Sequence, residues 1–71
     1  MNAREIKKAF KELLPVVYRE PNQKSVQCSH IVEVIYYHSP HSGRIAVSCV
    51  LQDANCPHST IRAKSRHIHF K

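Results

Sequence analysis

Glycine and tryptophan are almost missing from this chain of 71 residues, which contains one Gly and no Trp. A single glycine excludes a glycine-rich phosphate loop, because such loops need several positions without a Cβ atom. The lack of Trp, with only two Phe, excludes a large aromatic platform for stacking bases. Three cysteines cannot all pair, which argues against a secreted disulfide framework. We therefore expect reduced thiols and a cytoplasmic protein.

Long apolar runs are absent as well. The longest, residues 13–18 and 34–37, fall far short of the ~20 residues that a membrane span needs. The first eight residues also lack the continuous apolar stretch of a signal peptide. The length allows one domain with a small core. The sequence therefore predicts a single domain over residues 1–71 and no membrane partner.

The N-terminal residues carry a complete helix signature. Asn2 is a favourable N-cap, and Glu5 stands three residues later, as in a capping box. Apolar residues then recur with helical spacing, and Pro15 disfavours helical dihedrals in the residue before it. This pattern predicts a helix over about residues 3–13.

After Pro15 the apolar spacing changes from helical to alternating, which indicates strands. The predicted strands cover residues 16–18, 25–37, 44–52, 60–63 and 67–70, with a kink at 64–66. Apolar residues on both faces of the long second segment indicate a bulge. Because no crossover helix separates the strands, the sheet should be antiparallel. The predicted fold class is α+β, an N-terminal helix followed by a meander of four or five antiparallel strands. A small SH3-like barrel capped by the helix and an open sheet with the helix on one face are the two alternatives.

A small core should form between the apolar stripe of the helix and the inward positions of the strands. The residues that we expect there are Ile6, Phe10, Leu13, Val32, Val34, Val47, Cys49, Leu51, Ile61 and Ile68.

Three short motifs resemble a known group of proteins. They are Pro15-Val16-Val17-Tyr18, Ile31-Val32-Glu33-Val34 with two tyrosines soon after, and Ser48-Cys49-Val50-Leu51-Gln52-Asp53. In these motifs the chain is similar, over about residues 13–68, to small proteins of Firmicute genomes that are often encoded near phage or mobile-element genes. The resemblance implies no particular activity, cofactor or site residue.

Two Cys-x-His pairs, formed by Cys28 with His30 and by Cys56 with His58, are the candidates for a metal site. Zinc takes four such ligands, but a single residue between ligands is shorter than the two to four of common zinc motifs. We therefore expect two core cysteines and one loop cysteine rather than a metal, and no cofactor. No nucleophile motif accompanies these residues, so we expect no enzymatic activity.

Charge of one sign is the remaining imbalance, with 11 Lys and Arg against 5 Asp and Glu, or a net charge of +6 with neutral histidines. Like-charged neighbours along the helix cost a few tenths of a kcal/mol per pair, and no acid follows Asp53. Lys and Arg neutralise phosphates, so this pattern favours weak nucleic-acid binding. The candidate contact residues are Arg4, Lys7, Lys8, Lys11, Arg62, Lys64 and Arg66.

The predicted function is thus a small non-enzymatic binding module with weak polyanion contact. His67 and His69 flank the C-terminal cations, so binding should strengthen toward pH 6. The alternative is a protein–protein interaction module without nucleic-acid binding, because small sheets expose edge strands that can recruit a partner strand.

Overall fold

The computed structural model describes all 71 residues, and its first element is helix α1, Ala3–Glu12. The predicted capping box is present: the N–H of Glu5 donates to Asn2 Oδ1 (2.8 Å), and the N–H of Asn2 donates to Glu5 Oε1 (3.0 Å). The helix ends where Leu13 takes a left-handed conformation, with φ 53° and ψ 44°. The N–H of Leu14 then donates to the carbonyl of Ala9 (3.0 Å), which closes the C-terminal turn.

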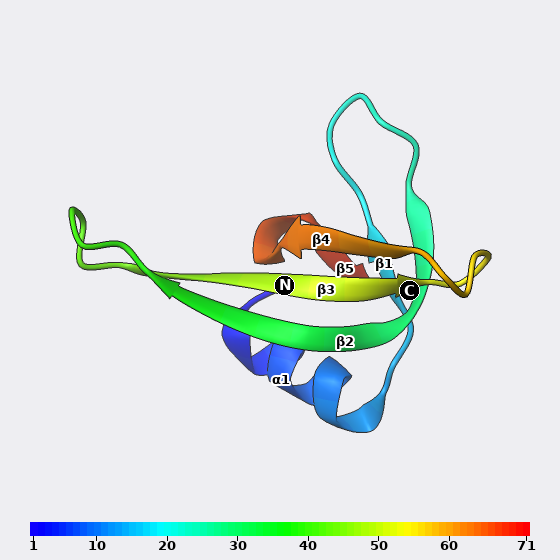
Figure 1. Ribbon diagram of the computed structural model, residues 1–71, viewed down its shortest axis with the longest axis horizontal. Coiled ribbons are helices and arrows are strands. Elements are labelled where there is room, and N and C mark those ends of the chain that lie inside the picture. Colours follow the sequence, from blue (N-terminus) through cyan, green and yellow to red (C-terminus); the bar gives the residue numbers. More distant parts are fainter.

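The rest of the chain forms one five-stranded sheet (Figure 1). Its elements are β1 Val16–Tyr18, β2 Val26–His38, β3 Ile45–Asp53, β4 Thr60–Lys64, the 3₁₀ helix η1 Ser65–His67, and β5 Ile68–Phe70. All pairings are antiparallel, so the predicted α+β class and meander are confirmed. The predicted irregularity of β2 is also present, as shifts of register against β3 between Cys28 and His30 and between Ile31 and Glu33.

The first and last strands meet in the sheet, whose order is β4-β3-β2-β1-β5. The edge strands β4 and β5 follow one another in the chain through η1, but no strand pairing joins them, so the sheet is open. The chain start lies at this junction, where the ammonium of Met1 donates to the carbonyls of Ser65 (2.8 Å) and Ile68 (2.9 Å). Neither helix combines the length and apolar character needed to cross a membrane.

The core lies between α1, which packs against β2, and the inner face of the sheet. Its buried residues come from the helix and all five strands: Ile6, Ala9, Val16, Cys28, Ile31, Cys49, Leu51, Ala63 and Ile68. The prediction is confirmed for Ile6, Cys49, Leu51 and Ile68, and the partly buried Val34, Val47 and Ile61 pack against this cluster.

The prediction is wrong for three of the expected core residues. Phe10, Leu13 and Val32 are 40%, 65% and 45% exposed. Ile6 and Ala9 form the inward line of the helix, which leaves Phe10 at its margin. Leu13 lies beyond the last helical turn, and Val32 falls within a register shift, where alternation no longer fixes which face a side chain takes.

Candidate polyanion-binding site

The seven cations predicted to contact nucleic acid are all exposed. Arg4, Lys7, Lys8 and Lys11 lie along α1 and line no pocket, and neither does Arg62 on β4. Lys64 lines one pocket, and Arg66, in η1, lines two. The predicted set is therefore distributed over the surface, and Arg66 is the member that lines a pocket with Arg19, His67 and His69.

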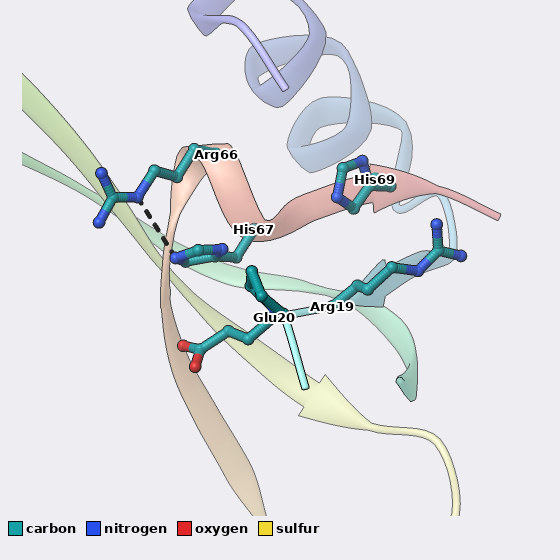
Figure 2. A pocket seen from close by; sticks show the side chains of 6 residues that line it. Arg19, Glu20, Arg66, His67 and His69 are labelled. Carbon is teal, nitrogen blue, oxygen red and sulfur yellow. Dashed lines mark hydrogen bonds between the residues drawn. The ribbon is translucent and has the colours of Figure 1, made fainter. Parts of the chain in front are cut away.

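That group forms a hollow of about 400 Å³, here called the cationic pocket (Figure 2). Its lining residues are Arg19, Glu20, Pro21, Arg66, His67 and His69. In Figure 2, His67 lies in the middle, with the side chains of Arg66 and Arg19 on opposite sides of it. Two arginines against one carboxylate give the pocket a charge of +1 with neutral histidines and +3 with both protonated.

The pairing of β1 with β5 brings these residues together. Tyr18 lies opposite Ile68 in that pair, and one residue further on, the N–H of Arg19 donates to the carbonyl of His67 (2.8 Å). The rings of Tyr18 and His67 lie near one another, with centroids 6.4 Å apart and planes inclined by 59°. The end of β1 and the start of β5 are thus fixed relative to one another by backbone and ring contacts.

Two hydrogen bonds set the electrostatics of the cationic pocket. Arg66 Nε donates to His67 Nε2 (3.3 Å), which requires an unprotonated Nε2 and so a neutral ring. Protonation at that nitrogen would end this bond and place a second cation beside the guanidinium. The hydroxyl of Tyr18 donates to Glu20 Oε1, and this hydrogen bond, with burial and the charge of Glu20, raises the pKa of Tyr18.

Arg19 is the pocket residue that sequence reasoning missed. It stands alone after a three-residue strand, and nothing near it in the sequence marks it as part of a basic cluster. The other basic residues of the cationic pocket lie 47 or more positions later in the sequence, and only the pairing of β1 with β5 brings them near Arg19. His67 and His69 were predicted to flank the basic surface, and both line the pocket with Arg66.

A second hollow, here called the edge pocket, has about 690 Å³ and lies where β3 extends past the end of β4. Its lining comes from the chain start, the distal part of the β2–β3 hairpin and the β4–η1 junction: Met1, Asn2, Ala3, Tyr37, Ile45, Ala46, Val47, Ser48, Lys64, Ser65 and Arg66. Six of its eleven lining residues are hydrophobic, whereas none of the residues that line the cationic pocket is.

The candidate metal ligands do not assemble. Cys28 is buried in the core, His30 is half-buried on β2, and Cys56 and His58 are exposed in the loop before β4. No group of three or more His, Cys, Asp or Glu side chains is close enough to hold a metal ion. Burial raises the pKa of the Cys28 and Cys49 thiols, and the charge of Asp53 adds to the effect on Cys28. Both thiols are free, as is that of Cys56.

No family model, curated protein or solved structure matches this chain. The similarity to the Firmicute group stays a prediction, and the function has to be argued from the two pockets.

Proposed function

We propose that this protein is a cytoplasmic, non-enzymatic binding module whose basic surface contacts a polyanion, with nucleic acid as the preferred class. The single observation that carries the proposal is the cationic pocket, where Arg19, Arg66, His67 and His69 line one hollow. Guanidinium groups bind phosphate oxygens with paired hydrogen bonds, and histidine adds donors that depend on pH.

The surrounding surface supports the same reading. No residue after Asp53 is acidic, and Arg62 and Lys64 project from β4, which leads into η1. At the chain start, Asn2 and Ala3 line the edge pocket with Arg66, so the basic helix begins beside η1. Cations in this arrangement give affinity without base selectivity, with dissociation constants of about 10⁻⁴–10⁻⁶ M at physiological salt.

The test compares two double variants that remove equal charge. Arg19→Gln with Arg66→Gln changes the cationic pocket, whereas Lys24→Gln with Arg44→Gln changes two exposed residues outside both pockets. The probe is a fluorescein-labelled single-stranded oligonucleotide of about 12 nucleotides, and its anisotropy is measured over a range of salt concentrations. The pocket variant should lose about 0.7 from the salt slope for each phosphate contact removed, and the control should keep the slope of the parent protein.

Acidity provides the second arm of this test. Between pH 7.5 and pH 6.0, affinity should rise, because a protonated imidazole is a cation that attracts phosphate, and His67→Gln with His69→Gln should reduce that rise. The groups that face these rings are Arg19, Glu20, Arg66 and Tyr18. Equal losses in both double variants would assign binding to diffuse charge, and no binding by the parent protein at low salt would refute the proposal.

A further inference from the structure

The first three residues of β3 have a partner on only one side. On the β2 side, Ile45, Ala46 and Val47 pair with His38, Tyr37 and Tyr36. On the other side, β4 reaches only as far as Lys64, which pairs with Ser48, and the chain then turns away into η1. Figure 1 shows the hairpin continuing beyond the end of β4. Ile45–Val47 is therefore a free sheet edge.

The backbone groups of Ile45 and Val47 point toward this free side. In an antiparallel strand, alternate residues direct both N–H and C=O to the same neighbour. The carbonyl of Arg44 accepts from Ser39 on the β2 side (3.0 Å), and the N–H of Asp53 donates to Ser59 on the β4 side (3.1 Å). Odd-numbered residues of β3 thus face β4. The register that pairs Ser48 with Lys64 places Val47 opposite Ser65 at the start of η1, which contacts β3, so Ile45 is the residue whose backbone groups point past this junction toward the edge pocket.

The walls of the edge pocket suit an added peptide strand. Tyr37 and Ile45 are 62% and 66% exposed, and with the half-buried Val47 they offer apolar contact area. The other wall is the β4–η1 junction, where the ammonium of Met1 is bonded to the carbonyl of Ser65. A volume of about 690 Å³ leaves room for several residues of an extended chain.

Charge decides what kind of strand fits. Lys64 and Arg66 line the edge pocket, and no acid does. The chain has no acidic residue between Val34 and Gln52, so the whole free edge and its hairpin present only neutral and basic groups. A second copy would bring its own Lys64 and Arg66 against these cations, whereas an acidic peptide would neutralise them.

We propose that the free edge at Ile45–Val47 binds an extended acidic peptide segment as an additional strand. The N–H and C=O groups of Ile45 pair with its backbone, its apolar side chains lie on the face of Ile45 and Val47, and its carboxylates lie on the opposite face, near Lys64 and Arg66. The two proposed sites share Arg66, but Lys64 lines only the edge pocket and Arg19 only the cationic pocket, so variants at Lys64 and Arg19 distinguish them.

The test uses two blocked hexapeptides with the same apolar alternation, acetyl-Val-Glu-Val-Glu-Val-Thr-amide and acetyl-Val-Lys-Val-Lys-Val-Thr-amide. Each is titrated into ¹⁵N-labelled protein, and amide shifts and hydrogen exchange are recorded. The glutamate peptide should shift the amides around the edge pocket and slow exchange at Ile45. Ala46 should keep its exchange rate, because its N–H already faces β2.

Charge reversal supplies the matched variants. Lys64→Glu should weaken the glutamate peptide by up to about fivefold, the range that exposed ion pairs account for, and strengthen the lysine peptide. Lys24→Glu makes the same charge change at an exposed loop residue outside the pocket and should alter neither affinity. Ile45→Pro removes the edge donor where proline is tolerated and should abolish the amide shifts that the glutamate peptide causes.

Four outcomes would overturn the proposal. They are an edge that responds to neither peptide, equal responses to both peptides, equal losses in Lys64→Glu and Lys24→Glu, and protection of the edge by self-association in the absence of peptide. In the last case a second copy, detected by concentration-dependent sedimentation, would be the occupant. An oligonucleotide that protected Ile45 where the glutamate peptide did not would assign the edge to nucleic acid.

Discussion

The β2–β3 hairpin has a covered half and an uncovered half, although the alternation of side chains along β3 runs through both. In the half near the rest of the sheet, Cys28, Ile31, Cys49 and Leu51 are at most 2% exposed. In the distal half, Ile45 continues the inward line of β3 but is 66% exposed. Alternation therefore assigns a side chain to a face, and burial requires another element to cover that face.

The covering elements can be named. Leu51 has Ile31 on one side and Ile61 of β4 on the other, and α1 packs against β2. Ile45 pairs with His38 alone, because β4 ends at the level of Ser48. The distal half of the hairpin is uncovered, so its backbone and its apolar side chains are accessible. The residues there contribute little to stability and are the ones that a partner can reach.

The largest expected effect separates the two halves directly. Leu51→Ala should destabilise the fold by about 2–5 kcal/mol, because it leaves a cavity among packed side chains. A domain this small has about 5 kcal/mol in total, so the variant should be partly unfolded. Ile45→Ala, on the same face of the same strand, should cost within about 0.5 kcal/mol. Urea unfolding of both variants measures the difference, and similar midpoints would show that cover does not distinguish the halves.

Phe10 extends the comparison to the helix. A fully buried Phe→Ala change costs about 3–5 kcal/mol, but Phe10 is 40% exposed and should lose only about 1–2 kcal/mol. Ile6, which is 1% exposed on the same helix, supplies the control, and Ile6→Ala should cost more than Phe10→Ala. A reversed order in thermal melts would place Phe10 in the core after all.

The three cysteines also differ in whether they are covered, and we expect this difference to appear in the reactivity of their thiols. Burial raises the pKa of Cys28 and Cys49, which keeps both as neutral thiols, whereas Cys56 is exposed in a loop. With a chromogenic aromatic disulfide at pH 8, one thiol should react quickly and two only as the protein unfolds. Cys56→Ser should remove the fast phase, and a fast phase that survived it would contradict the assignment.

The same thiols give stability a dependence on alkaline pH. Their pKa is higher in the folded than in the unfolded chain, so their contribution is complete below the unfolded value of about 8.5 and is lost as pH rises through the folded value. The urea midpoint should fall between pH 8 and pH 10. Cys49→Ala should show a shallower fall, although it starts from a lower midpoint.

Local signals predicted most of the fold. The capping box of Asn2 and Glu5 set the start of α1, Pro15 its end, and alternation the strands, because each of these preferences acts within a few residues. The pairing of β1 with β5 lies outside such signals, and so does the cationic pocket, whose Arg19 and Arg66 meet only through that pairing. The exposure of Phe10 was missed for a related reason, since periodicity does not report which elements cover a face.

Substitutions of Leu13 should change stability least, and they distinguish the contribution of its side chain from that of its backbone conformation. It is 65% exposed, so its side chain adds little, while its left-handed conformation, with φ 53°, costs an L-residue about 1–2 kcal/mol. Glycine adopts this conformation without strain but loses more entropy on folding, by about 0.5–1 kcal/mol. Leu13→Gly should therefore stabilise the protein by about 0.5 kcal/mol, which raises the Tm by roughly 2–4 °C. Leu13→Ala removes most of the same side chain but retains the Cβ, so it should lower the Tm slightly. If both variants lowered the Tm equally, the contacts of the Leu13 side chain would outweigh the backbone strain. The side chain at the C-terminal turn of α1 would then contribute to stability as the covered side chains of the hairpin do.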